Sequence, residues 1–298
     1  MACFALSFSK TLMSGLRMPG LGVILSGLIM LTGCSSLVRQ GRDAVGLGPK
    51  NEVVQRNLTY VQRPEGDLKL DLYVPKSSQA MPVVVWFHGG LWRYGTKEFN
   101  FHLRDLTQQG FAVATVQYRK IGEAAWPAAL DDAEAGFSWL KENAQRYGLD
   151  PDRMFLAGES AGGHVAALLA SELGRRRVRA LCLLYAPTDM DSLWAKYKDF
   201  SPSNQLFIEF FGTDQARAAD IVHQASPLRR VTRHMPPTLM YHGEHDWMVP
   251  LSQSQALATR LEELGVETKL VVVSGQNHAF PLTTAQMVGV ASFFRAHL

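Results

Sequence analysis

One serine of this chain stands where a nucleophile would be expected. Ser160 is the central residue of the pattern G-x-S-x-G at residues 158–162, with a β-rich run before it and an Ala- and Leu-rich stretch after it. Small residues beside Ser160 allow the sharp turn from strand to helix that presents a hydroxyl at the edge of a sheet. The free N–H groups at such a helix start face developing negative charge. The pattern and its setting therefore predict that Ser160 is a nucleophile.

A serine hydroxyl is a poor nucleophile without a base, so a histidine is expected downstream. His278 lies within residues 274–280, a predicted loop directly after the last apolar run. From there it could reach back over the edge of the sheet, and we predict that it is the base. The other histidines have other settings: His297 is near the C-terminus, His102 falls on a predicted surface helix, His223 and His234 lie in a long insertion, and His164 is expected to pack against loops one helical turn past Ser160.

A carboxylate is needed to fix the tautomer of the base and to stabilise its protonated form. Residues 241–250, at the end of another apolar run, offer Glu244 and Asp246. Asp246 holds the position from which a short side chain would point into a cleft, and we expect it to be the acid in preference to Glu244. The chain order Ser160, Asp246, His278 is the order found in α/β-hydrolases.

The same run could also be interpreted as a metal site, because His242, His245 and Asp246 all carry donor atoms. It lacks the pattern H-E-x-x-H and any paired cysteines, however. We therefore expect no metal ion and no other cofactor.

A second glycine-containing segment follows an apolar run, at His88-Gly89-Gly90-Leu91-Trp92. Glycines let the backbone come close to a substrate carbonyl group, so that its N–H groups can bind an oxyanion. The position of this segment, before the first long predicted helix, favours that role over a simple glycine turn.

Short β-rich runs alternate with helical stretches from Val53 onward, which implies right-handed βαβ units and a mostly parallel sheet. The expected fold class is therefore α/β. The expected strands are residues 53–61 and 68–74, as an antiparallel hairpin, then 83–88, 111–118, 154–158, 180–185, 238–242 and 269–273, and the expected helices lie near 98–109, 127–146, 161–174, 251–264 and 283–297.

About 50 residues, roughly 187–236, carry no strand signal and are rich in large aromatic side chains. An insertion of this length is more often a functional lid than a slack loop. Together with Trp92 and Trp247, its aromatic residues favour a crowded site that accepts short acyl chains. In the alternative interpretation they form the core of the insertion itself and leave the cleft open.

The N-terminal 33 residues have the pattern of an export signal. Lys10 and Arg17 precede an uncharged apolar run at 21–31, which is too short to span a bilayer as a helix. The segment ends in Leu-Thr-Gly-Cys, which resembles a bacterial lipobox with Cys34 as the lipidated residue, and a start at Met13 or Met18 would also fit. We expect a lipoprotein signal peptide at 1–33, a tether at 34–52 and one domain at 53–298.

This signal predicts a cell-envelope location. The resemblance to lipoproteins, with Ser35 after the cysteine, implies an outer-membrane anchor facing the periplasm of a Gram-negative bacterium. Without Lys10 and Arg17 the chain has 28 basic and 27 acidic residues, so its charge gives no reason to expect nucleic-acid binding. If Cys34 is acylated, Cys182 is the one remaining free thiol, in an apolar run typical of an inert buried cysteine.

The segments described above, taken together, resemble the hormone-sensitive-lipase-like esterases and, more closely, their relatives typified by acetyl and feruloyl esterases, prenylcysteine methylesterase and kynurenine formamidase. The similarity is carried by residues 88–92, 118–119, 126–127, 131–132, 147–153 and 158–164, and it resumes at 225–228, 242–250 and 277–280. It thus covers most of residues 53–298 and implies an α/β-hydrolase fold.

The resemblance also implies roles for individual residues. Ser160, Asp246 and His278 would form the triad. The oxyanion hole would be formed by backbone N–H groups of the segment Gly89, Gly90 and Leu91 together with Ala161. Leu91 stands where these lipases often have a third glycine, followed by Trp92, and this variant is shared by esterases and formamidases.

Three functions are compatible with these observations. The favoured one is a lipid-anchored serine esterase that acts on small-molecule esters with small or medium acyl chains. The second is an amidohydrolase of the kynurenine formamidase type, although an export signal does not suit a reaction of cytosolic tryptophan breakdown. The third is a catalytically silent binding protein of the envelope, although silent relatives usually lose a triad residue and all three are present here. The sequence leaves the oligomeric state open.

Overall fold

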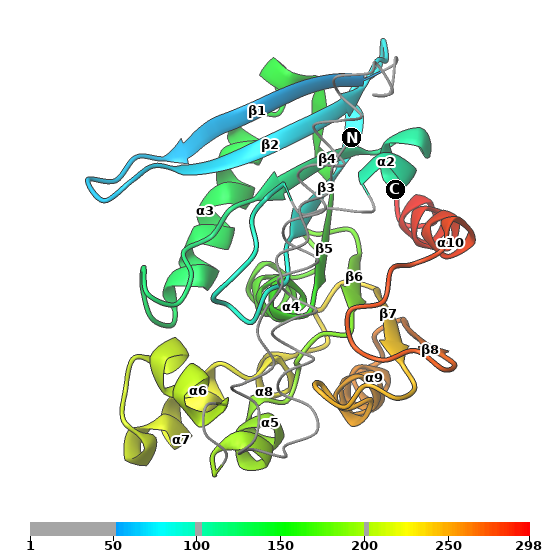
Figure 1. Ribbon diagram of the computed structural model, residues 1–298. Helices are drawn as coiled ribbons and strands as arrows, with labels where there is room; N and C mark the ends of the chain where they lie inside the picture. The colour runs from blue at the N-terminus through cyan, green and yellow to red at the C-terminus, as the bar shows by residue number, and fades with distance from the viewer. Residues whose placement is uncertain (1–51, 99–102, 200–202) are drawn as a thin grey trace, which may run out of the picture. The chain divides into compact units, whose positions relative to one another are not determined.

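The structure is a computed structural model that describes residues 52–98, 103–199 and 203–298 (Figure 1). The expected signal peptide, Cys34 and all but the last residue of the expected tether lie outside the described residues. Among those described, no helix has both the length and the apolar character that crossing a bilayer requires.

The described strands form one eight-stranded sheet with the order β1-β2-β4-β3-β5-β6-β7-β8. Strand β2 runs antiparallel to both of its neighbours, and every other adjacent pair is parallel. The strands are β1 Glu52–Val61, β2 Leu68–Pro75, β3 Met81–Phe87, β4 Ala112–Val116, β5 Leu149–Glu159, β6 Leu181–Leu184, β7 Thr238–Gly243 and β8 Thr268–Val273. The mostly parallel α/β fold and the N-terminal hairpin predicted from the sequence are confirmed.

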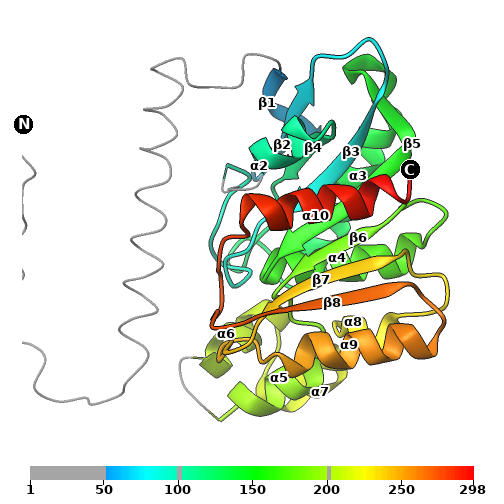
Figure 2. The same ribbon diagram turned by 90° about the vertical axis from the view of Figure 1, so that its right-hand side faces the viewer.

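Helices cover both faces of this sheet, which is why its strands β3, β4 and β6 are mostly apolar and have every residue buried. Side chains of α3 (Ala128–Glu142), α4 (Ala161–Leu173) and α9 (Ser252–Glu263) pack in the core on one face. Those of α2 (Leu103–Gln108) and α10 (Thr284–Arg295) pack on the other, where Figure 2 shows α10 in front of the strands.

Several expected boundaries differ from the structure, and two of these differences have a clear physical reason. Helix α3 ends at Glu142 instead of 146, and Gln145–Tyr147 form a 3-10 turn that Gly148 closes in a left-handed conformation. Strand β5 begins at Leu149 instead of 154, because the start of β3 pairs with this polar segment through Met81. Because Asp150, Asp152 and Arg153 are polar, a prediction that looks for apolar runs misses this first part of the strand.

In the described part of the chain, four helices connect β6 to β7: α5 Met190–Tyr197, α6 Ser203–Phe211, α7 Gln215–Gln224 and α8 Pro227–Arg230. Because β6 leads directly into this segment, the helices lie at the carboxyl end of the sheet, where Figure 1 shows α5, α6 and α7 grouped together. Buried aromatic side chains, among them Phe207, Phe210 and Phe211, give this segment its own apolar cluster. We call residues 187–236 the helical insertion.

Candidate active site

The turn from β5 into α4 holds Ser160 in an unusual conformation. Its φ of 48° lies in the left-handed region that residues other than glycine seldom adopt, and its N–H group donates to the carbonyl oxygen of Leu184 on β6 (2.9 Å). The turn also requires glycine at 162, since a Cβ atom there would overlap the carbonyl oxygens of Phe87 and His88. Strained backbone held by its surroundings is typical of functional sites, and here it projects the Ser160 hydroxyl from the end of β5.

The structure brings Ser160, His278 and Asp246 into one line of hydrogen bonds. The Oγ atom of Ser160 lies 2.9 Å from Nε2 of His278, and Nδ1 of His278 lies 2.7 Å from Oδ2 of Asp246. With the proton on Nδ1 donated to the carboxylate, Nε2 is free to accept the proton of the serine hydroxyl. This is the nucleophile–base–carboxylate arrangement that activates a serine.

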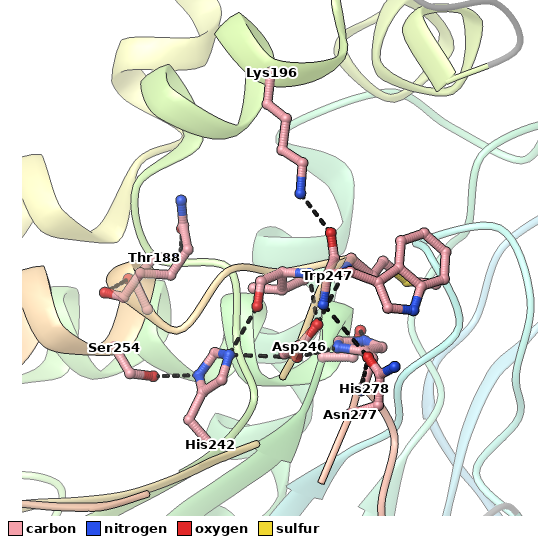
Figure 3. Close-up of polar contacts among 12 residues, drawn as sticks. Thr188, Lys196, His242, Asp246, Trp247, Ser254, Asn277 and His278 are labelled. Carbon is pink, nitrogen blue, oxygen red and sulfur yellow. Dashed lines mark hydrogen bonds and ion pairs between the residues drawn. The ribbon is translucent and has the colours of Figure 1, made fainter. Parts of the chain in front are cut away.

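Asp246 is buried but well supplied with donors (Figure 3). Its Oδ1 accepts the N–H groups of Met248 (3.0 Å) and Val249 (2.8 Å), and Nε2 of His242 lies 3.3 Å from its Oδ2. Burial alone would raise the pKa of Asp246, but hydrogen bonds from His242 and His278 outweigh it and lower the pKa to about 2. The carboxylate is therefore charged at neutral pH.

His242 also contacts Asp246, and the sequence did not predict this contact. It is completely buried on β7, with Nδ1 2.7 Å from the Oγ atom of Ser254 and Nε2 2.8 Å from the carbonyl oxygen of Val249. These contacts fix the ring beside Asp246. The sequence signal for this contact is the position of His242 near a strand end, four residues before Asp246.

Glu244 and His245 lie apart from this line of hydrogen bonds. Glu244 accepts hydrogen bonds from Oγ of Ser274 (2.7 Å) and N–H of Gly275 (3.0 Å), and Nε2 of His245 lies 3.9 Å from its Oε2. The structure thus places Asp246, and not Glu244, beside His278. Within the described ranges, no three His, Cys, Asp or Glu side chains are grouped so that they could hold a metal ion.

Residues 89–92, which we call the oxyanion segment, begin beside Ser160. A Cβ atom on Gly89 would stand only 3.3 Å from Cβ of Ser160. The chain reverses just beyond, since the N–H group of Tyr94 donates to the carbonyl oxygen of Gly90 (2.7 Å). Ala161 is the first residue of α4, and the first N–H groups of a helix have no acceptor within it. Of the predicted oxyanion residues, Gly89 and Ala161 therefore lie beside Ser160.

Trp92 is buried beside the helical insertion. Its side chain is only 3% exposed and packs on Phe210 of the helical insertion, with ring centroids 4.6 Å apart. Its indole therefore belongs to the apolar cluster of the insertion. Trp247, next to the acid, is 46% exposed.

The helical insertion also contacts residues 244–250, which carry Asp246 and which we call the acid loop. The Oη atom of Tyr197 on α5 donates to the carbonyl oxygen of Met248 (2.8 Å), and Nζ of Lys196 donates to that of Trp247, as Figure 3 shows for Lys196. The loop that carries Asp246 is therefore held from the side of the insertion.

Glu159 and Tyr185 form a further polar pair beside the site that the sequence did not reveal. Tyr185 donates to Oε2 of Glu159 (3.0 Å), and its ring meets that of His278 edge-on with centroids 5.0 Å apart. Burial raises the pKa of Glu159 above its ordinary value, although the hydrogen bonds from Tyr185 and Gly89 oppose this. Tyr185 thus contacts His278 through its ring and Glu159 through its hydroxyl group.

Comparisons with known proteins agree with this fold. The family model described as BD-FAE matches residues 70–261. A probable isoprenylcysteine alpha-carbonyl methylesterase of Arabidopsis thaliana, ICMEL1, is 28% identical over 243 residues, which are 76% of this chain and 51% of that protein. Esterase LipC of Mycobacterium tuberculosis is 26% identical over 222 residues, or 70% of this chain and 55% of LipC. The chain spans about half the length of these curated relatives.

Solved structures show the same architecture. Esterase B of Lactobacillus rhamnosis superposes with a TM-score of 0.72 at 22% identity, covering 93% of this chain and 96% of that one. A bifunctional GH43-CE protein of Bacteroides eggerthii gives a TM-score of 0.74 at 25% identity, over 82% of this chain and 38% of that one.

Proposed function

Because this chain belongs to the BD-FAE family, we propose that it is a serine hydrolase that cleaves carboxylic esters through an acyl-enzyme. The observation that carries the proposal is the line of hydrogen bonds from Ser160 through His278 to Asp246, with distances of 2.9 and 2.7 Å. The names of relatives support the same reaction, since they include a methylesterase and an esterase.

In the proposed mechanism, Oγ of Ser160 attacks the carbonyl carbon of the ester while Nε2 of His278 takes the hydroxyl proton. The carbonyl oxygen becomes an oxyanion, which the backbone N–H groups of Gly90, Leu91 and Ala161 stabilise. The intermediate then collapses, and the alcohol leaves with the proton from His278.

Deacylation repeats these steps with water as the nucleophile. His278 takes a proton from the water, a second tetrahedral intermediate forms, and Ser160 leaves with the proton as the carboxylic acid is released. Asp246 stabilises the imidazolium in both halves of the reaction, and its own hydrogen bonds keep it ionised for that task.

We propose small or medium acyl chains for the substrate. Trp92, at the end of the oxyanion segment, packs with Phe207 and Phe210, and each of the three is only 3% exposed. A long acyl chain therefore has no room on that side of the nucleophile unless these rings move.

The test is a substrate screen with the full-length chain purified in detergent. It would include p-nitrophenyl esters of graded acyl length and N-formylkynurenine, with the Ser160→Ala variant as the control. We expect ester hydrolysis that disappears in the variant. Faster turnover of N-formylkynurenine than of any ester would indicate the formamidase alternative, and no turnover at all would indicate the silent binding protein.

For its location we propose a lipid anchor on Cys34 in the outer membrane, facing the periplasm of a Gram-negative bacterium. The support is the Leu-Thr-Gly-Cys end of the apolar N-terminal run. The enzyme would then act on small-molecule esters that reach the cell envelope.

A further inference from the structure

We propose that His164 is a positioning residue that holds the oxyanion segment in place through the indole N–H group of Trp92. This inference rests on the proposed serine hydrolase mechanism and adds a residue to it. Leu91 and Trp92 are consecutive residues with φ values of 56° and 54°, in a region that L-residues with side chains seldom adopt. Such strain persists only where the surroundings fix it.

Trp92 is the part of the segment that the surroundings hold. Its Nε1–H group donates to Nδ1 of His164 (3.1 Å), and its carbonyl oxygen accepts the N–H group of Ile121 (2.8 Å). Its ring packs on Phe210 and is almost fully buried. The indole is thus fixed by one directional hydrogen bond and by apolar contacts, and that fixes the two residues before it.

His164 suits this role because both of its ring nitrogens are used. Its Nε2 lies 2.7 Å from the carbonyl oxygen of Ala225, which requires a donor, and its Nδ1 must then accept from Trp92. The ring is fully buried in α4, and burial lowers its pKa to about 4. A neutral ring with one defined tautomer follows at neutral pH.

The position of His164 makes this contact relevant to catalysis. It lies one turn after Ser160, on the helix whose first residue is Ala161. One hydrogen bond therefore sets the distance between the segment that carries Gly90 and Leu91 and the helix end that carries the nucleophile and Ala161. Through Ala225, at the end of α7, the same imidazole ties the helical insertion to the oxyanion segment.

Three substitutions separate the two hydrogen bonds of His164. Trp92→Phe removes the indole donor and keeps an aromatic ring. His164→Gln can place an amide near the position of Nε2 and so can reach Ala225, but it has no acceptor at the position of Nδ1. His164→Asn has the opposite property, since its side-chain oxygen can stand where Nδ1 stands and accept from Trp92.

We expect Trp92→Phe and His164→Gln to lower kcat by about 10-fold or more with KM changed by less than about threefold, because only the transition state needs the oxyanion donors. His164→Asn should recover much of the lost kcat. The double variant Trp92→Phe/His164→Gln should be no worse than the poorer single variant, since both remove the same contact.

A trifluoromethyl ketone inhibitor gives the readout that a merely structural role would not move, because its adduct with Ser160 puts an oxyanion in the same place. Its affinity should fall in parallel with kcat in Trp92→Phe and His164→Gln. Phe211→Leu is the matched control, since it perturbs the same aromatic cluster without touching the hydrogen bond. All variants are compared well below their unfolding temperatures.

The outcomes distinguish this inference from the proposed function. If the wild-type chain hydrolyses no ester, the proposed function is wrong. If the wild type is active but Trp92→Phe and His164→Gln keep its kcat and inhibitor affinity, or lose them only as much as Phe211→Leu does, the positioning role of His164 is wrong.

Discussion

The Nε2 atom of His242 lies 3.3 Å from Oδ2 of Asp246, on the same carboxylate oxygen that faces His278 at 2.7 Å. Asp246 is therefore held between two imidazoles while its other oxygen accepts two backbone N–H groups. This environment fixes the direction of the carboxylate and keeps it ionised. Buried charges need such partners, because an unpaired carboxylate would be protonated instead.

Replacing the acid tests its assignment. Asp246→Asn should lower kcat by about 10⁴-fold, because an amide in its place favours the wrong tautomer of His278. Glu244→Gln should leave kcat within about threefold, since Glu244 is bonded to Ser274 and Gly275 and not to His278. Steady-state kinetics on one ester decide the matter. The reverse ranking of the two variants would move the acid to Glu244.

Replacing the nucleophile should lower kcat by about 10⁴- to 10⁶-fold while the protein stays folded. Ser160→Ala removes the only atom proposed to form the covalent intermediate, and it leaves the glycine contacts of the turn in place. Ser171→Ala on the same helix is the matched control, because its hydroxyl bonds only to the carbonyl oxygen of Leu168 (2.7 Å). Activity of Ser160→Ala within about tenfold of the wild type would contradict a serine mechanism.

The fold was predictable because its signals are local. Each central strand is a run of apolar side chains that needs cover on both faces, and the helices between them carry their own amphipathic patterns. The polar start of β5 escaped prediction because only pairing with β3 makes Leu149–Arg153 a strand. Similarly, the contact of Trp92 with the helical insertion escaped prediction because Phe210 is distant in sequence.

The site was predictable in part for the same reason. The strand–turn–helix setting of Ser160 and the strand-end loops of Asp246 and His278 are visible in short windows of sequence. The contact from Trp92 to His164 spans 72 positions and that from His164 to Ala225 spans 61. No local pattern connects such residues, and only the packing of α4 between the oxyanion segment and the helical insertion brings them together.

Acid should destabilise the protein through its buried histidines. Burial lowers the pKa of His88 and of His164 to about 4, from about 6.5 in an unfolded chain. Between these values the unfolded state binds more protons, so the free energy of unfolding falls as pH drops from about 6.5 to about 4. The loss is on the order of 3 kcal/mol for each histidine.

His164→Asn should flatten this dependence, because it removes one of the two groups. The measurement is the unfolding temperature of the wild type and of the variant at several pH values between about 4 and 7. His234→Asn, at an exposed position, should keep the slope of the wild type. Equal slopes in all three proteins would contradict a neutral, buried His164.

Cys34→Ser should abolish lipidation in a Gram-negative host and leave a protein that no longer partitions into the membrane fraction. The apolar run at 21–31 should not hold the mature chain there, because signal cleavage removes it. Metabolic labelling with a fatty acid followed by membrane fractionation measures both effects. A wild-type chain that takes up no label would show that Cys34 is not a lipidation site.

Acyl-chain length should decide how well an ester is hydrolysed. Each CH₂ group that the site buries adds about 0.8 kcal/mol, so kcat/KM rises with chain length while the chain fits. At the end of the oxyanion segment, Trp92 packs with Phe207 and with Phe210, whose ring centroid is 4.6 Å from that of Trp92. We propose that these rings set the limit of the acyl site. Beyond that limit a further CH₂ group gains nothing or clashes.

We therefore expect kcat/KM on p-nitrophenyl esters to peak at acyl chains of about two to six carbons and to fall for longer ones. Phe207→Ala offers a check on the cause, because a smaller side chain behind Trp92 should shift the peak toward longer chains if those rings set the limit. Trp247→Ala, at the exposed edge of the acid loop, should not shift it. Rates that keep rising to about twelve or sixteen carbons, above the concentration at which the substrate forms micelles, would instead indicate a lipase with an open cleft.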